Sequence, residues 1–486
     1  MDIIEGYRDK FEADEEARYD NGLRFINNSI DRLHLIDERA GGKRIEMFKN
    51  PKVKMLLANM GRLSTELVAT TLQGIGINAE AMPVPDAHTL QMARNHMSGK
   101  ECLPSQLVPG EARSFITSDK YKKDEIYLLF VPTTTGPCRT GQYYIFYENL
   151  FKDLEVDNIV IVTMDSDNSY NELGPAFARN AWWAIIISDY MKDIETTLRA
   201  CAEDPEMAME IYDHEWHRLL NNGGDLTSIL PTLKSVAENL KKIPLKRNIE
   251  DAPKVLIVGE IYVRRDDFAV DELVGMLAEK GIIAKVSGVA EWIYYCDYMR
   301  KYELQKKLKL MPWYKKAISP EMKKRFVWEV EQTYKQSVDL RVKNVLKTTG
   351  LLPSTPHDMN KIMDNAYSNF VTSELESEIS ISSGAAATAM EADFSGIINI
   401  SPFACLIGRV IEGIMTPWTR DQNYTMISVE IDGNILPPNI VNKLEIFMLN
   451  VLRFRQDPSI DMLLEKRDGQ SSRISRKISR DVKETS

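Results

Sequence analysis

Short apolar runs alternate with helix-length amphipathic segments through most of this chain of 486 residues. An apolar run within residues 53–60 is followed by a helical pattern over 63–72 and by a second apolar run over 75–81. This order is typical of a strand, a crossover helix and a parallel neighbouring strand. Because the same order returns from residue 254 onward, the sequence predicts an α/β protein with two lobes, each built on a parallel sheet.

The length predicts more than one hydrophobic core, since single cores stop growing at roughly 250–300 residues. A polar segment bounded by Pro244 and Pro253 indicates a linker, and a lysine-rich, glutamate-rich stretch over 300–370 indicates helices inserted into the second lobe. The expected divisions are a helical N-terminal extension over residues 1–50, a first lobe over 51–243, the linker over 244–253, a second lobe over 254–455, and a polar, disordered tail over 456–486.

The charge balance is acidic, with a formal net charge of -10 at pH 7. This argues against nucleic acid or an anionic membrane as the partner, because such surfaces recruit lysine and arginine. The first residues lack the basic-then-apolar pattern of a signal peptide, and the most apolar stretch, residues 181–187, is far shorter than the roughly 20 residues that span a bilayer. We therefore expect a cytoplasmic protein without a membrane partner.

Five cysteines are few for this length, and their odd number indicates a reducing compartment rather than a disulfide framework. Cys102, Cys138 and Cys405 each lie in a short turn that contains glycine or proline, and the last two follow apolar runs that predict buried strands. Open α/β sheets bind their ligands at such strand ends. Cys201 and Cys296 lie within helical or aromatic runs, where a free thiol commonly packs as a small apolar group.

The three turn cysteines form a candidate metal site, although no local C-x-x-C pair supports it. Glycine lets the backbone turn closely around a cluster, proline stiffens the loop, and neighbouring amides can donate hydrogen bonds to thiolate and sulfide. An iron–sulfur cluster with three thiolate ligands would keep one corner for substrate or water. The alternatives are three unrelated loop cysteines, or a zinc clip in a non-catalytic protein that binds a small ligand or a partner.

The order of the motifs carries a resemblance to a known family. After the Cys102 turn come Gly-Pro-Cys-Arg-Thr-Gly-Gln-Tyr over residues 136–143, Gly-Glu-Ile-Tyr-Val-Arg over 259–264, Glu-Trp-Ile over 291–293, and Ile-Ile-Asn-Ile-Ser-Pro-Phe-Ala-Cys over 397–405. In this order they resemble the activase-related branch of the 2-hydroxyacyl-CoA dehydratase and benzoyl-CoA reductase family. The resemblance spans about residues 50–455.

The resemblance implies two flavodoxin-like lobes and a [4Fe-4S] cluster held by Cys102, Cys138 and Cys405, which match the ligands of the family's dehydratase subunits. It also implies a partner, an ATPase of the actin-like superfamily that carries its own cluster and injects low-potential electrons. Since the chain lacks a glycine-rich phosphate loop with a following lysine, that partner would hydrolyse the ATP. The chain departs from the family at residues 406–408, Leu-Ile-Gly, where we expect proline after the cysteine.

Two further residues are candidates for chemistry. Glu260 follows a predicted strand, where it could act as an acid–base group in the cleft or simply turn the chain. Arg139 adjoins Cys138 and could stabilise an anionic cluster or a thioester oxyanion, or lie at the surface. The function expected from the resemblance is an iron–sulfur redox protein of anaerobic metabolism that passes electrons to a substrate such as acyl-CoA or to another reductase. Aromatic residues at 292–295 and 313–314, expected at the surface, predict a homodimer.

Overall fold

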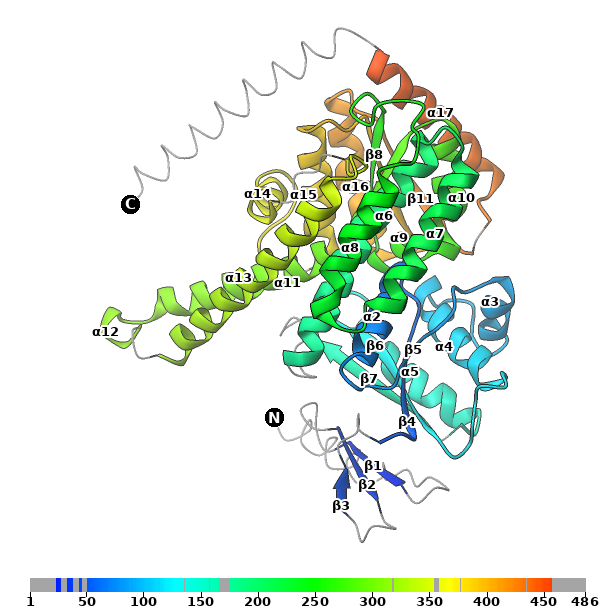
Figure 1. Ribbon diagram of the computed structural model, residues 1–486. Coiled ribbons are helices and arrows are strands. Elements are labelled where there is room, and N and C mark those ends of the chain that lie inside the picture. The colour runs from blue at the N-terminus through cyan, green and yellow to red at the C-terminus, as the bar shows by residue number, and fades with distance from the viewer. Residues whose placement is uncertain are drawn as a thin grey trace.

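The computed structural model describes residues 50–456, apart from residues 135, 157, 166–174, 317–318, 354–357, 376 and 434, together with three strands between residues 23 and 45. Figure 1 shows two lobes, each with a sheet and covering helices, and a helical arm that projects to one side. Two four-stranded parallel sheets confirm the predicted α/β fold with two flavodoxin-like lobes.

The first lobe is built on the strands β4 (Val53–Leu57), β5 (Ala79–Ala81), β6 (Ile126–Thr133) and β7 (Ile159–Asp165). They lie in the order β5-β4-β6-β7, and every neighbouring pair is parallel. The continuous apolar sequence of β6 follows from its central place, because a strand covered on both faces has no polar side. The helices among these strands are α2 (Arg62–Gln73), α3 (Ala87–Arg94), α4 (Leu103–Ile116) and α5 (Thr140–Asp153).

The second lobe repeats this topology with the strands β8 (Lys254–Gly259), β9 (Ile283–Val286), β10 (Gly396–Pro402) and β11 (Met426–Ile431). Their order is β9-β8-β10-β11, again parallel throughout. In both lobes the spatial order is second, first, third and fourth strand, which is the flavodoxin-like order. Every residue of β8 and β10 is buried.

This strand order fixes where a ligand can bind. In each sheet the chain runs to one side after its first strand and to the other side from its third, so a crevice opens between the first and third strands. That crevice lies between β4 and β6 in the first lobe and between β8 and β10 in the second. Open α/β sheets bind ligands there, at the carboxyl ends of the strands.

A helical layer joins the two lobes. Helices α6 (Pro175–Cys201), α7 (Pro205–Asn222) and α8 (Leu226–Leu240) form one apolar core with α2 and with two second-lobe helices, α11 (Val289–Leu310) and α13 (Pro320–Lys347). α6 is buried along most of its length, because it packs on α2 of the first lobe and on β9 of the second. The segment 244–253 then connects α8 to β8, and the Lys246 N–H donates to the Cys201 carbonyl at 2.9 Å.

Helices also fill the remaining connections of the second lobe. The stretch from 300 to 370 contains the end of α11, all of α13, and two shorter helices. None of the helices that the structure describes is long and apolar enough to cross a membrane. The helices of this lobe not yet named are α9 (Ile261–Arg265), α10 (Asp267–Glu279), α12 (Trp313–Lys316), α14 (Met359–Asn369), α15 (Glu378–Met390), α16 (Leu406–Asp421) and α17 (Pro438–Gln456).

The predicted helical N-terminal extension is wrong for the residues that the structure describes there. Leu23–Asn27 (β1), Leu33–Asp37 (β2) and Lys43–Ile45 (β3) form an antiparallel sheet in the order β1-β2-β3. Runs such as Leu-Arg-Phe-Ile and Leu-His-Leu-Ile are short, rich in large apolar residues and separated by Asn and Gly signals, a pattern typical of hairpins. The charged composition of the segment obscured this pattern. The predicted disordered tail, apart from Gln456, lies outside the described residues.

Candidate functional site

A cavity of about 270 Å³ lies between the lobes at the carboxyl ends of their strands. The carboxyl ends of β4 and β6 and the loops after them line it from the first lobe, including the stretch 131–134 and the stretch 136–138. Residues 260–262, which follow β8, and residues 377–378 at the start of α15 line it from the second lobe. The cavity therefore lies where the crevices of both sheets open.

Polar contacts hold the lobes together beside this cavity. The Tyr262 hydroxyl lies 3.2 Å from Glu111 Oε1 on α4, and the Arg62 backbone N–H donates to Asp267 Oδ2 at 2.7 Å. Both contacts join a residue of the first lobe to a residue of the second. They fix the separation of the lobes, and with it the width of the cavity.

Cys138 lines the cavity in the loop between β6 and α5. Its Sγ lies 3.2 Å from Thr140 Oγ1. The loop closes tightly on the start of α5, since a Cβ at Gly141 would lie only 2.5 Å from the carbonyl oxygen of Thr134. The second glycine of the Gly-Pro-Cys-Arg-Thr-Gly motif is therefore required by backbone packing.

Cys102 and Cys405 each occupy the N-cap position of a helix, α4 and α16. Cys102 Sγ lies 2.7 Å from the hydroxyl of Tyr143 on α5, while Cys405 follows β10 and is 8% exposed. A Cβ at Gly408 would clash with Ser401 Oγ, so α16 can begin this close to the strand only with glycine there. This packing gives a structural reason for the Leu-Ile-Gly sequence after Cys405.

Each of the three cysteines thus stands at the start of a helix. The amide N–H groups of a helix's first turn have no partner within the helix, and they give this end a partial positive charge. Anionic sulfur is therefore favoured at all three positions. The amides that favour the thiolates of Cys102, Cys138 and Cys405 belong to Ser105, Thr140 and Gly408, respectively.

Burial works against ionisation of these thiols. It raises the pKa of Cys102 to about 11, raises that of Cys138, and raises that of Cys405 to about 12. The charge of the Cys138 thiolate raises the pKa of both other cysteines, so Cys138 lies within electrostatic range of each. Without metal the three thiols hold their protons at neutral pH, and a bound metal would have to displace them.

The three sulfur atoms are not gathered around a single ion. Within the part of the chain that the structure describes, no group of three or more His, Cys, Asp and Glu side chains is placed to hold a metal ion. A zinc ion would bring its sulfur ligands within about 3.8 Å of one another, since each Zn–S bond is ~2.3 Å. A cubane cluster separates its ligands more widely, because each binds a different iron. Three thiols at amide-rich helix starts around one cavity fit the donor chemistry of such a cluster.

Two buried carboxyl groups lie on the second-lobe side of the cavity. Glu260 accepts hydrogen bonds from the N–H groups of Tyr262 at 3.1 Å and Val263 at 2.9 Å, and Glu378 accepts one from the Ile261 N–H at 2.8 Å. Burial raises the pKa of both, and the charge of Glu260 helps to raise the pKa of Glu378, to about 8. The pair therefore retains a proton at neutral pH.

Arg139 lies outside the cavity lining. Its Nη1 donates to the carbonyl oxygen of Lys100 at 3.0 Å. Because Lys100 precedes Cys102, this bond ties the Cys102 turn to the loop of Cys138. The geometry thus gives Arg139 a part in holding two cysteine loops together.

The remaining wall of the cavity is mainly apolar. It includes the rings of Phe130, Phe177, Trp182 and Trp292. One cation, Lys335, also lines it, but its Nζ pairs with Asp297 Oδ2 at 2.6 Å. The cavity therefore suits an uncharged, apolar group better than an anionic one.

The aromatic run at 292–295 is not the surface patch that the sequence predicted. Trp292 and Ile293 line the cavity, and Tyr295 is buried. The run belongs to α11, which packs its first turns against the interior of the protein. Tyr314, in the other predicted pair, is exposed.

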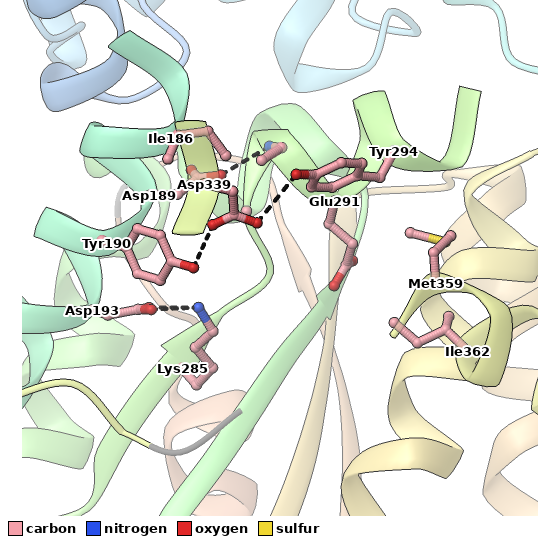
Figure 2. A pocket seen from close by; sticks show the side chains of 12 residues that line it. Ile186, Asp189, Tyr190, Asp193, Lys285, Glu291, Tyr294, Asp339, Met359 and Ile362 are labelled. Carbon is pink, nitrogen blue, oxygen red and sulfur yellow. Dashed lines mark hydrogen bonds and ion pairs between the residues drawn. The ribbon is translucent and has the colours of Figure 1, made fainter. Parts of the chain in front are cut away.

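A small cavity of about 40 Å³ lies among α6, β9, α11, α13 and α14, and several charged side chains take part in its lining (Figure 2). Lys285 Nζ lies 2.7 Å and 2.6 Å from the two carboxylate oxygens of Asp193. Asp339 accepts hydrogen bonds from the hydroxyl groups of Tyr190 at 2.6 Å and Tyr294 at 3.1 Å. These bonds connect α6 to β9 and α13, and they connect α13 to α11.

Asp189 fixes the start of α11 in the same region. It accepts hydrogen bonds from the backbone N–H groups of Val289 at 3.2 Å and Ala290 at 2.8 Å, and it pairs with Arg265 at 3.0 Å. Residues 289, 292 and 293 line the large cavity, so this polar joint holds one wall of the candidate site in place.

Sequence reasoning missed Glu378 as a site residue. A signal for it exists, because Glu378 is the single charged residue in 377–390, a stretch otherwise made of small and apolar residues. A lone carboxyl group in an otherwise apolar, buried helix needs a specific partner, because an unpaired buried charge is costly. Cys201 and Cys296 are buried, as expected, and none of the five cysteines forms a disulfide.

No model of a known protein family matches this chain, and no curated protein matches it either. The geometry of the cavity and of the cysteines around it is therefore the main guide to function.

Proposed function

We propose that this protein is an iron–sulfur redox protein that holds a [4Fe-4S] cluster with Cys102, Cys138 and Cys405 beside the interlobe cavity. One observation carries the proposal: α4, α5 and α16 begin around the same cavity, with Cys102 and Cys405 as the N-caps of α4 and α16 and Cys138 just before the N-cap of α5. The order of motifs that resembles the 2-hydroxyacyl-CoA dehydratase and benzoyl-CoA reductase family points to the same residues.

The helix starts offset the negative charge of the thiolates. Backbone amides in the first turns of α4, α5 and α16 already favour the ionised sulfurs, and the Tyr143 hydroxyl lies at hydrogen-bond distance from Cys102 Sγ. When bound, such a cluster supplies single electrons, at potentials that proteins tune over roughly −700 to +450 mV. Burial of the three sulfurs in a largely apolar region favours the low end, because an apolar surrounding disfavours the negative charge that reduction adds to the cluster. Hydrogen bonds from backbone amides partly compensate this charge.

The cavity is the proposed place of the electron acceptor. Its apolar wall excludes water and suits the acyl part of a thioester such as an acyl-CoA. Burial raises the pKa of Glu260, which favours a protonated carboxyl group that can donate its proton to an oxygen atom on a substrate that gains electrons. Transfer to a second reductase is the other outcome that this function allows.

Electrons would reach the site from a separate ATPase of the actin-like superfamily. Phe403 and Leu406, which flank the buried Cys405, are 63% and 55% exposed. Exposed apolar side chains beside a redox centre form a suitable contact for a protein donor. Arg409 pairs with Glu412 and Glu430 next to this contact and gives it a charged rim. A cytoplasmic location belongs to this proposal, because an oxygen-sensitive cluster with free thiols requires a reducing compartment.

The test is anaerobic purification of the full chain, reconstitution with ferrous iron and sulfide, and measurement of iron, sulfide and the visible absorption spectrum. We expect a brown protein with close to four iron atoms per chain. Cys138→Ala should lose most of this iron. Cys201→Ala is the matched control, because it removes a buried thiol that does not line the cavity, and it should keep the iron of the unchanged protein.

Equal iron loss in the two variants would refute the ligand assignment. A colourless protein that binds stoichiometric zinc through the same cysteines would instead establish the non-catalytic alternative, a two-lobed binding protein with a zinc clip.

A further inference from the structure

Glu378 occupies a position in the second lobe that corresponds, in the order of strands and helices, to that of Cys102 in the first lobe. α4 leads directly into β6, the third strand of the first sheet, and α15 leads directly into β10, the third strand of the second. Cys102 is the N-cap of α4, and Glu378 is the first residue of α15. Cys138 and Cys405 also occupy corresponding positions, because each lies in the loop that follows the third strand of its lobe. The two lobes therefore offer two pairs of matching positions.

Glu378 is placed to act together with the cysteines. It is 6% exposed and lines the same cavity as Cys138. Its charge influences both Cys138 and Cys405, so it lies within electrostatic range of each. Among the described residues, one oxygen of Glu378 accepts a hydrogen bond, from the Ile261 N–H, whereas Glu260 uses both of its oxygens to cap α9.

We propose that Glu378 is the fourth protein ligand of the cluster and binds, through a carboxylate oxygen, the iron that the three cysteines leave without a sulfur. The inference rests on the proposed cluster. Iron in such a site is held less firmly than iron bound by thiolate, because the soft cluster iron prefers sulfur to a hard oxygen donor. The corner at Glu378 is then the one that exchanges, next to the cavity where a substrate would bind.

The experiment compares reconstituted full-length protein with the variants Glu378→Gln and Glu378→Cys. Mild oxidation with ferricyanide removes one electron from a [4Fe-4S]²⁺ cluster, which releases one Fe²⁺ and leaves a [3Fe-4S]⁺ cluster with a characteristic electron paramagnetic resonance signal. We expect the unchanged protein to form this signal and Glu378→Gln to form it at least tenfold faster. Glu378→Cys should retain four iron atoms, because its fourth iron gains a thiolate.

Glu445→Cys controls for an added thiol, since Glu445 is exposed on α17, and it should behave like the unchanged protein. Equal rates of iron loss in all four proteins would overturn the assignment of Glu378 while leaving the cluster itself established. If the unchanged protein takes up no iron under any condition, the proposed function fails, and the ligand role of Glu378 fails with it.

A second, independent feature is the helical arm formed by residues 301–330. Arg300 on α11 and Glu331 on α13 pair at 3.1 Å at its base, and the two helices extend beyond this pair to α12 at the tip (Figure 1). From residue 300 to residue 310, α11 advances about 15 Å. Fourteen large apolar side chains of the described residues are exposed, and five of them lie in this short segment: Leu310, Tyr314, Phe326, Val327 and Val330.

The arm is also basic, whereas the rest of the chain is acidic. Residues 301–330 contain nine Lys and Arg and three Asp and Glu, a net charge of +6. The whole chain carries -10, so the remainder carries −16. We infer that the arm docks on the acidic body of a second copy of this chain, and that the second copy's arm docks in return, as two-fold symmetry requires. The apolar side chains supply the buried contact, and the charges select the partner surface.

Light scattering coupled to size-exclusion chromatography tests this assignment. The unchanged protein should have twice the chain mass of 55.5 kDa, and 1 M salt should shift it toward the monomer. Phe326→Ser combined with Val330→Ser should give a monomer with an unchanged circular dichroism spectrum. Ile446→Ser combined with Leu449→Ser, at comparably exposed positions on α17, should remain dimeric. A monomeric unchanged protein overturns the inference. The inference also fails if the Phe326→Ser, Val330→Ser variant keeps the mass of the unchanged protein but loses binding to anionic lipid vesicles.

Discussion

Removal of Lys285 tests how far the buried joint between the lobes stabilises the fold. Lys285 and Asp193 have side chains that are 6% and 4% exposed, and both carboxylate oxygens of Asp193 contact the ammonium group. Lys285→Met leaves the Asp193 carboxylate buried without its cation. Loss of one partner of a buried pair costs about 3–5 kcal/mol of folding free energy. We expect a cost of this size at pH 7, measured by urea denaturation.

The cost should depend on pH in a direction that the structure fixes. Burial raises the pKa of Asp193, and the charge of Lys285 opposes that rise. Without Lys285 the pKa of folded Asp193 rises further, so the folded state keeps a proton that the unfolded chain releases above about pH 4. The free energy of unfolding of the variant must then fall by up to about 1.4 kcal/mol per pH unit, as the pH rises from about 4 to the pKa of Asp193 in the folded state. The destabilisation should therefore be larger at pH 7 than at pH 5, by at most about 1.4 kcal/mol for each pH unit.

Two comparisons decide whether this reasoning holds. Lys52→Met removes the cation of an exposed pair with Asp124, whose side chains are 46% and 63% exposed, and it should cost less than about 1 kcal/mol. Lys285→Met combined with Asp193→Leu removes both charges and should recover most of the lost stability. A Lys285→Met cost that equals the surface control, or that is the same at pH 5 and pH 7, would refute the account.

Three further outcomes follow from the cavity and its helix starts. Gly408→Ala should destabilise the protein and lower its iron content, because the added Cβ meets Ser401. Gly413→Ala on the same helix is the control: its Cβ meets nothing within 4 Å, so it should stabilise the protein by up to about 1 kcal/mol. Denaturation and iron analysis compare the two variants. Ala181→Phe should weaken binding of a neutral apolar probe such as toluene at least tenfold in calorimetry with iron content unchanged, and unaltered affinity would place the probe elsewhere. Phe403→Ser with Leu406→Ser should slow reduction by a partner ATPase at least tenfold at constant iron content, and an unchanged rate would exclude this face as the docking site.

The strand-end cysteines were predictable because their signals are local. The apolar runs before Cys138 and Cys405 fix two buried strands, and β6 and β10 indeed end at Thr133 and Pro402, a few residues before each cysteine. The topology then follows from the alternation of strands and helices. Cys102 was expected in a turn, and it is in fact the N-cap of α4, with no strand immediately before it.

Other features depend on contacts that no local pattern carries. α6 looks like an ordinary helix of the first lobe, but its polar residues Asp189 and Asp193 are buried against the second lobe. The apparent surface aromatics at 292–295 are inside because Asp189 fixes the start of α11 there. In the N-terminal segment, three short strands were mistaken for helices, because the density of charged residues outweighed a weak alternation of apolar ones.

The matching helix starts explain how two lobes with little sequence in common could together build the proposed cluster site. What a cluster requires from the backbone is a strand end and a helix start, and the flavodoxin-like order provides both in each lobe without any particular sequence. The first lobe places Cys102 and Cys138 at these positions, and the second places Glu378 and Cys405. Each lobe alone offers at most two donors, too few for a cubane. The proposed cluster would span both lobes and depend on α6 and its buried ion pairs, so the Lys285→Met variant should lose iron more readily as well as unfold more easily.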